Sequence, residues 1–444
     1  MLFSLEVRRA RKGDCLLLHY GERGDSKLIL IDGGPRGVYK SHLRPRIGEL
    51  RQARHLQATD PLRIDAVMVS HVDDDHIQGI LELTGDLLVA QREHKPQAVQ
   101  ILDLWHNSFG DIIGHGGEKL TASVEAQFGA AAVSGSGEFS DDQMSEVESE
   151  YAAKHSHVDD DEAKELVAST LKVLASVGQG YQLRVNAEAL GIEPNAEFDG
   201  KLIIASKDSK PTCMGKGLTF AVVGPMQPEI DALHKKHTSW LKDLERHGKP
   251  LPQALAAYVD KSVANLSSIV VLARVENKSI LLTGDARGDK ILQGLELTGA
   301  IEQGGKLKVD ILKVPHHGSD NNLDDDFFKR IVADHYVFSG DGEHGNPERA
   351  TMEMLFGARG DDDYTVHLTY PIDELDEGRK ADWEKEQNKE RKKKKKKPSQ
   401  QVRPDWSPAK NALRSFFDAH AGLEEKVRIV DAKKRHVIDL LDPL

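Results

Sequence analysis

The segment HVDDDH, at residues 71–76, constrains this chain more than any other feature of its sequence. It follows the apolar run IDAVMVS, which is typical of a buried strand, and it precedes IQGILELTG, which is apolar at helical spacing. A tight turn at a strand end can direct His71, Asp73, Asp75 and His76 toward one point. Imidazole and carboxylate groups together suit zinc, manganese or iron. The alternative is an acidic surface loop whose aspartates cap the following helix.

Three later strand patterns end in residues of the same kinds. LLTGD ends in Asp285, VPHHGS contains His316 and His317, and SGDGEHGNPE contains His344. One aspartate or histidine after a strand is usually a turn residue or a satisfied polar group. Their joint occurrence at successive strand ends favours a shared metal site over separate turns.

The rest of the sequence bounds the fold and the class of protein. Short apolar strand patterns alternate with helical patterns along 444 residues, which predicts a layered α/β fold. The two cysteines, Cys15 and Cys213, lack the spacing of a disulfide framework or of a cysteine zinc site. No stretch reaches bilayer-spanning length, and charges among the first residues interrupt any signal-peptide core. We therefore expect a cytoplasmic protein with no membrane partner.

Several motifs in a fixed order resemble one known family. They are GDCLLLHYG, LILIDGG, SHVDDDHIQGI, LTFAVVGP, NLSSIVVLARVENKSILLTGD and LKVPHHGS. Together they resemble the metallo-β-lactamase superfamily, specifically hydrolases similar to the soluble domain of the ComEC competence proteins. The resemblance covers most of residues 1–370 and leaves out residues 110–165 and the lysine-rich segment. It implies an α/β metallo-β-lactamase fold, a four-layer αββα sandwich.

The resemblance also implies a metal-ligand set. His71 would bind the first metal ion, and Asp75 and His76 would bind the second. Asp285 would bridge the two ions. His344 matches the late histidine that completes the second site. We therefore expect two divalent metal ions, zinc or manganese, as cofactors.

The remaining matched residues have supporting or catalytic roles in the same comparison. Asp32, in IDGG, would lie beneath the metal loop and orient its ligands. His316 and His317 would face the substrate, where one of them would donate a proton or contact a phosphate. Asp75 or Asp285 would hold the attacking water.

Two positions depart from the pattern of the family. Asp73 stands where the common HxHxDH motif has its second histidine, and Asn265 and Ser268 precede LLTGD where many members supply another histidine. Asp73 is therefore a candidate ligand, and Asn265 a candidate supporting residue. A first site that is poor in histidine and rich in oxygen favours manganese over zinc, or binds its ion weakly.

These expectations lead to one main function and two alternatives. The main one is a metal-dependent phosphodiesterase or nuclease that hydrolyses DNA or RNA. The first alternative is a hydrolase of a small phosphorylated or acyl substrate, such as a cyclic nucleotide or a lactone, with residues 110–165 as a lid. The second is a regulatory protein with a degenerate metal site.

Changes of composition divide the chain into three parts. Residues 1–372 form the expected catalytic domain, with a Gly-, Ser- and acid-rich insertion at about 110–165. Residues 373–402, almost without apolar side chains, are expected to form a charged loop or linker. Residues 403–444 are expected to form a helix and a hairpin that pack on the core.

Two further charged clusters have weaker functional signals. HSHVDDDE, at residues 155–162, imitates a ligand cluster, but polar, helix-prone residues precede it and no buried strand directs it to a pocket. The lysine run could contact a nucleic-acid backbone through phosphates, or it could simply be solvated. Its candidate contacts are Lys392, Lys393, Lys394, Lys395, Lys396 and Lys397.

Overall fold

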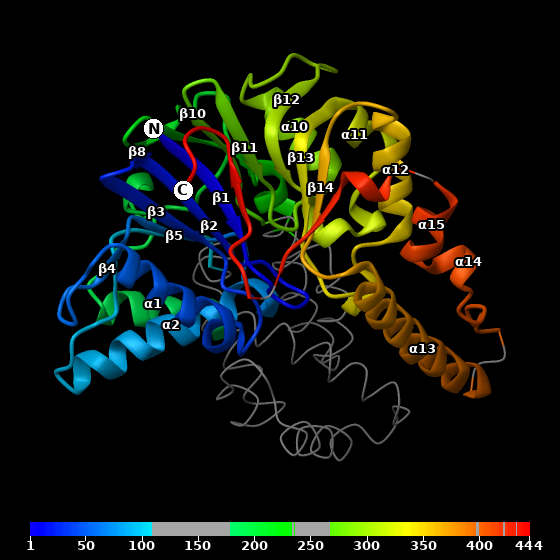
Figure 1. The fold of residues 1–444 in the computed structure, drawn as a ribbon, viewed down its shortest axis with the longest axis horizontal. Coiled ribbons are helices and arrows are strands. Elements are labelled where there is room, and N and C mark those ends of the chain that lie inside the picture. Colours follow the sequence, from blue (N-terminus) through cyan, green and yellow to red (C-terminus); the bar gives the residue numbers. More distant parts are fainter. Residues whose placement is uncertain (109–177, 233–234, 236–266, 397–398, 421, 432) are drawn as a thin grey trace.

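The computed structural model describes residues 1–108, 178–232, 235, 267–396, 399–420, 422–431 and 433–444. The insertion expected at about 110–165, including the cluster at 155–162, lies outside these ranges, and so do Asn265 and Lys397. Within them the chain forms two large β-sheets with helices on their outer sides (Figure 1).

Among the described residues, six strands form the first sheet in the order β16-β1-β2-β3-β5-β7. Their bounds are Leu2–Val7 (β1), Leu16–Glu22 (β2), Asp25–Ile31 (β3), Ala66–Val69 (β5), Leu104–His106 (β7) and Val437–Asp439 (β16). A separate small sheet pairs β4 (Leu62–Ile64) with β6 (Val99–Ile101).

The second sheet contains eight described strands in the order β15-β14-β13-β12-β11-β10-β9-β8. Their bounds are Thr212–Gly215 (β8), Leu218–Gly224 (β9), Val270–Val275 (β10), Lys278–Leu282 (β11), Leu307–Lys313 (β12), Ile331–Phe338 (β13), Thr365–Leu368 (β14) and Val427–Ile429 (β15).

Helices cover the outer face of each sheet. On the first sheet they are α1 (Arg44–Ala53) and α2 (Asp74–Arg92). On the second they are α10 (Gly288–Leu297), α11 (Asp325–Arg330), α12 (Arg349–Arg359) and α15 (Leu413–Ala419). No helix in the described ranges combines the length and the apolar character needed to cross a bilayer.

Side chains alternate between two apolar layers along each central strand. On β3, Ile29 and Ile31 pack between the two sheets, whereas Leu28 and Leu30 belong to the cluster that holds the apolar faces of α1 and α2. On β11, Leu281 likewise points outward to the helices of the second sheet. Helix, sheet, sheet and helix are therefore stacked in that order, and the expected four-layer αββα sandwich is confirmed.

The expected C-terminal helix is present as α15, but the expected hairpin is wrong. β15 pairs with β14 at the edge of the second sheet, and β16 pairs with β1 at the edge of the first. The chain between them crosses from one sheet to the other. Each sheet edge exposes unpaired backbone groups, and one added strand on each edge satisfies more of them than the two strands would by pairing together.

The loop or linker expected at 373–402 is wrong over most of its length. Residues Ile372–Lys396 form helix α13. Glu, Lys, Arg and Gln are strong helix formers, so a segment without an apolar core can still be helical. Tertiary contacts anchor it: Leu375 is buried, Arg379 donates to the carbonyl of Asn411, and Gln387 donates to the carbonyl of Arg403.

Three histidines, on β13, on β14 and directly before β16, lie in contact. His335 Nδ1 is 3.1 Å from His367 Nε2, and His367 Nδ1 is 2.7 Å from His436 Nε2. Burial, followed by the charges that His436 and His335 would carry, lowers the pKa of His367 to about 2. His367 therefore stays neutral in the folded protein at pH values where the unfolded chain protonates it.

This lowered pKa predicts acid destabilisation with a defined sign. The contribution of His367 is complete above the ordinary histidine pKa of about 6.5 and is lost as pH falls below it, by roughly 1.4 kcal/mol per pH unit. In urea unfolding between pH 7.5 and pH 5.5, with a chelator present, other buried histidines with a lowered pKa, such as His106, add slopes of the same sign. H367Q should therefore reduce the slope without abolishing it, whereas H94Q, at an exposed histidine, should leave it unchanged. Equal slopes for wild type and H367Q would contradict the assignment.

Candidate metal centre

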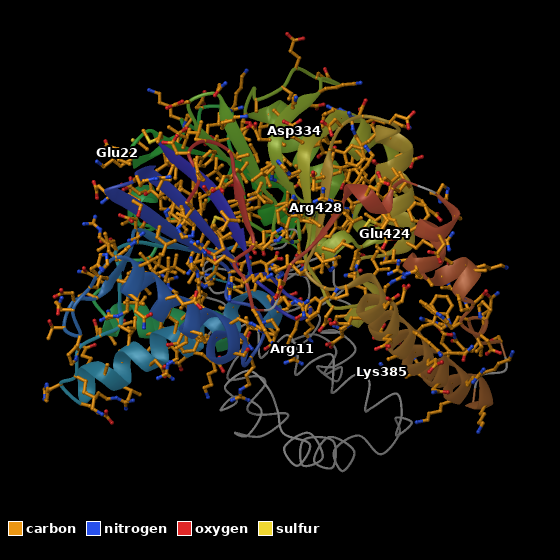
Figure 2. All side chains as sticks on the ribbon, in the orientation of Figure 1. Arg11, Glu22, Asp334, Lys385, Glu424 and Arg428 are labelled. Carbon is orange, nitrogen blue, oxygen red and sulfur yellow. The ribbon has the colours of Figure 1, made fainter. Side chains whose placement is uncertain are left out.

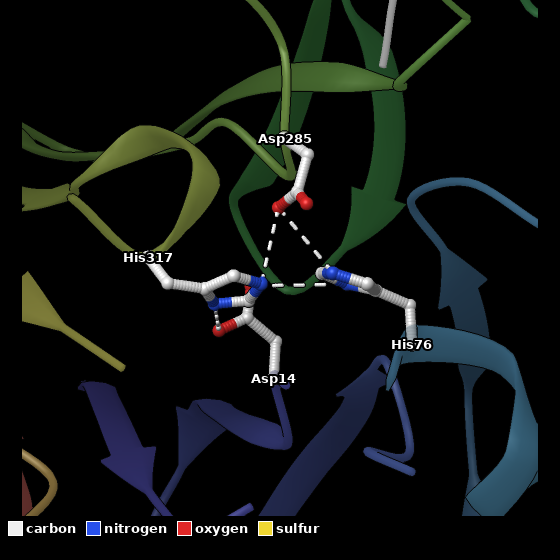
Figure 3. A group of neighbouring side chains, drawn as sticks. All are labelled: Asp14, His76, Asp285 and His317. Atoms are coloured by element: carbon white, nitrogen blue, oxygen red, sulfur yellow. Dashed lines mark ion pairs between the residues drawn. The ribbon is translucent and has the colours of Figure 1, made fainter. Parts of the chain in front are cut away.

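Parallel strands bring the predicted residues to one edge of the sandwich. β3 and β5 run parallel in the first sheet, and β11 and β12 run parallel in the second. Asp32 directly follows β3, and His71 lies two residues after β5. Asp285 and His317 follow β11 and β12. Figure 3 shows Asp285 and His317 approaching His76 from the other sheet.

Unusual backbone positions make this approach possible. Gly284 has a φ of +51°, and a Cβ added there would lie 2.8 Å from Cβ of Ser70, so only glycine lets the two strand ends meet. His316 and His317 both have left-handed φ values, 47° and 54°. Such conformations cost a non-glycine residue of order 1 kcal/mol or more, and they concentrate at functional sites.

The Asp285 carboxylate faces two pairs of histidines with different oxygens. Its Oδ1 lies 3.3 Å from His76 Nε2 and 3.4 Å from His317 Nε2. Its Oδ2 lies 3.6 Å from His71 Nε2 and 3.7 Å from His316 Nε2. One carboxylate between two sets of nitrogen donors could contribute an oxygen ligand on each side.

Two more aspartates add oxygen donors to these histidine pairs. Asp75 Oδ2 lies 3.6 Å from His317 Nε2, and its Oδ1 lies 4.0 Å from His76 Nε2. Asp73 Oδ2 lies 3.7 Å from His71 Nε2. Asp73 occupies the N-cap position of α2, but its side chain makes no capping hydrogen bond. The helix-capping interpretation of HVDDDH is therefore not realised at Asp73.

The donor atoms fit a divalent metal ion. His71 Nε2, His76 Nε2, His317 Nε2 and Asp285 Oδ1 are buried and satisfy no hydrogen bond. A buried polar atom left in this way costs about 1–3 kcal/mol, which a coordinated cation would recover. In two groups, one ligand atom from each residue lies within 4.8 Å of the ligand atoms of the others: Asp14, His76, Asp285 and His317, and His71, Asp75 and His76. Imidazole nitrogens with carboxylate oxygens suit zinc or manganese.

The other ring nitrogens are held by carboxylates and hydroxyls. Asp32 accepts a hydrogen bond from His76 Nδ1 at 2.8 Å, and it also accepts from the backbone N–H and the hydroxyl of Ser70. His317 Nδ1 lies 2.9 Å from Ser339 Oγ and 3.5 Å from Asp14 Oδ1. These contacts place the proton on Nδ1 and leave Nε2 free to bind a cation.

Sequence reasoning missed Asp14 and Lys313. Both are buried, and Lys313 Nζ lies 2.5 Å from Asp14 Oδ2. Asp14 stands in the matched motif GDCLLLHYG, which was the one available signal. Lys313 ends an apolar strand, where a lysine normally reaches for solvent, so only the tertiary structure shows that it neutralises a buried carboxylate.

Not every predicted residue joins the centre. The His344 side chain is 43% exposed, its Nε2 lies 3.8 Å from Glu343 Oε1, and neither metal-capable group includes it. His344 lies on η7 (Glu343–Gly345), a turn beyond the end of β13 that packs on α13. His317 lies beside Asp285, where His344 was expected. Lys392–Lys395 lie exposed at the far end of α13, and the side chain of Lys396 lies outside the described part.

The charged groups of the centre shift one another's pKa. Burial opposes ionisation of Asp285, but positive charge on His317, His76 and His316 outweighs it and holds the Asp285 pKa well below its usual range. Burial also opposes protonation of His317, but Asp285 and Asp14 raise its pKa to about 10. Protons on the imidazoles thus balance the carboxylates, and a metal ion has to displace them.

The two interpretations of His344 make opposite predictions about metal content. D285N should reduce bound zinc or manganese from about two equivalents per chain to well under one, because it weakens both sites. H344Q should leave the content unchanged. Elemental analysis after dialysis measures both. Loss of one equivalent in H344Q would restore the role implied by the family resemblance.

Comparison with known proteins agrees with this architecture. Residues 9–165 match the family model described as the metallo-beta-lactamase superfamily, a range that contains Asp14, Asp32 and the whole HVDDDH segment. A stretch of 53 residues, 12% of this chain, is 42% identical to microtubule-associated protein 1A of Rattus norvegicus and of Mus musculus. Over 62 residues, 14% of the chain, it is 37% identical to the Homo sapiens protein. These matches span 2% of the length of those relatives.

The family match and the four-layer sandwich together identify an α/β metallo-β-lactamase fold. The same match, with the metal-capable groups at the strand ends, supports a metal-dependent hydrolase.

Proposed function

We propose that this protein is a metal-dependent phosphodiesterase that hydrolyses DNA or RNA. The observation that carries the proposal is the Asp285 carboxylate, whose two oxygens face separate pairs of histidines. Two bridged cations can stabilise both the attacking and the leaving oxygen of an in-line phosphoryl displacement. The resemblance of the motifs to the soluble domain of ComEC supports nucleic acid as the substrate.

Different side chains would have different roles in such a reaction. Zinc or manganese ions, when bound, would acidify a water molecule and polarise a phosphoryl oxygen. Asp285 and Asp75 would fix the positions of the ions and orient the attacking water from the carboxylate side. Asp32 and Asp14 hold the Nδ1 sides of His76 and His317, which keeps both rings in place.

His316 is the better candidate for the proton donor. The His317 side chain is 3% exposed and lies among Asp14, Asp75, Asp285 and Ser339, whereas the His316 side chain is 25% exposed and contacts Asp285 from the other side. A general acid must reach the leaving oxygen of a bound substrate. The sequence alone left these two neighbours equivalent, and their different burial supports His316.

A substrate panel with added manganese or zinc tests the proposal. Labelled DNA or RNA and the small diester bis(p-nitrophenyl) phosphate should both be hydrolysed. D285N should lower kcat for both on the order of 100-fold or more. H316Q should lower kcat for nucleic acid by a similar factor but leave the p-nitrophenyl diester nearly unchanged, because p-nitrophenolate departs without a proton.

Three results would contradict the proposal. Equal loss on both substrates in H316Q would remove the proton-donor role. Turnover of a lactone or a cyclic nucleotide without turnover of nucleic acid would favour the small-substrate hydrolase. No bound metal and no turnover of any substrate would favour a regulatory protein with a degenerate site.

A further inference from the structure

The first turns of helix α13 pack against the loop that supports His317. Ser339, directly after β13, contacts His317, and a Cβ added at the next residue, Gly340, would lie 3.6 Å from Cβ of His317. Two residues further, a Cβ added at Gly342 would lie 2.4 Å from the carbonyl oxygen of Leu375. Only a glycine at 342 allows this approach to α13, so the loop behind His317 and the first turns of α13 form one packed unit.

The loop after β1 packs on the same end of α13 and places basic side chains near the metal centre. The backbone N–H of Arg11 donates to the Tyr370 hydroxyl, and Arg9 forms an ion pair with Glu374 at 3.8 Å. Lys12 Nζ lies 3.1 Å from Glu343 Oε1 and close enough to Asp75 for the two charges to interact. In Figure 2, Arg11 and Lys385 both lie at the lower side of the molecule.

The far end of α13 has a different charge pattern from its first five turns. Up to Glu390 acidic and basic residues are mixed, and they form pairs such as Lys380 with Glu384 and Lys389 with Glu386. The basic end, defined here as Lys392–Lys395, consists of exposed lysines without an intervening acid. Cations favour a helix C-terminus, but neighbouring like charges at i,i+3 repel one another. Four consecutive lysines exceed what the helix itself requires.

Helical geometry fixes the distance between the two ends. Gly378 contacts the loop at Gly342, and Lys394 follows it by 16 residues in one helix. At 1.5 Å per residue the separation along the axis is ~24 Å. One strand of duplex DNA places a phosphate about every 3.4 Å, so this length corresponds to roughly seven nucleotides.

We propose that the basic end of α13 is a second contact for the phosphate backbone, separate from the metal centre, so that the substrate is a nucleic acid longer than about seven nucleotides. This proposal rests on the proposed phosphodiesterase function. Successive lysines project about 100° apart around the helix, so they can neutralise phosphates over a broad range of approach angles. An anionic membrane surface is the competing partner for such a cluster.

The dependence of DNA binding on duplex length and on salt concentration distinguishes a phosphate contact from a purely structural role of these lysines. In the wild-type protein, binding of DNA duplexes, measured by fluorescence anisotropy with metal present, should strengthen between about 4 and 10 base pairs and then level off. K392Q/K394Q/K395Q should abolish that step, weaken binding of a 30-base-pair duplex about tenfold at 0.1 M salt, and reduce the salt slope by roughly 2 to 3. Hydrolysis of bis(p-nitrophenyl) phosphate should not change.

A matched variant controls for net charge. K306Q/K308Q/K329Q removes three exposed lysines elsewhere on the second-sheet side and should bind the 30-base-pair duplex like the wild type. K392R/K394R/K395R, which keeps the positive charges, should bind the 30-base-pair duplex like the wild type. An unchanged salt slope in K392Q/K394Q/K395Q would overturn the proposal, and so would an equal loss of DNA binding in the control variant. The proposal would also fail if K392Q/K394Q/K395Q lost binding to anionic vesicles but kept its binding to DNA. Failure of the small diester to react would instead overturn the proposed function, because that probe never reaches α13.

Discussion

The structure depends on one interaction between its two sheets: the Asp285 carboxylate meeting His71 and His76. Asp285 belongs to the second sheet and the histidines follow a strand of the first. The site therefore exists only while the apolar layer between the sheets stays packed, including residues such as Ile31 and Ile280. Gly284 sets the closeness of the two strand ends, since any larger residue there would push the sheets apart.

Charge compensation explains why so many carboxylates can be buried together. Lys313 pairs with Asp14, which leaves Asp32, Asp75, Asp285 and the more exposed Asp73 around the histidines. These remaining carboxylates would offset the charge of divalent cations bound at the centre. Buried carboxylates without such partners would be strongly destabilising. Lys313 thus compensates Asp14, and the proposed ions would compensate the carboxylates that face the Nε2 atoms.

Helix α13 and the pairing of strands β15 and β16 are parts of the fold that local sequence patterns did not predict. The helix begins against the loop that supports His317 and then runs away from the two sheets (Figure 1). Its charged composition suggested a loop, since absence of apolar residues usually means absence of packing. Helix propensity and a few long-range anchors such as Arg379 outweighed that expectation. The strands β15 and β16 likewise separated because two open sheet edges were available.

The sequence by itself determined the layers and the chemistry of the donor atoms. Alternation on strands such as β3, helical spacing after His76, and metal-binding residue types at successive strand ends are local patterns that need no knowledge of distant neighbours. Only the tertiary structure decided which residues meet. It brought in Asp14 and Lys313, buried His317 more deeply than His316, and left His344 on an exposed turn. The reason is physical: a ligand set is fixed by distances of a few ångströms across two sheets, and packing and close glycine contacts set those distances.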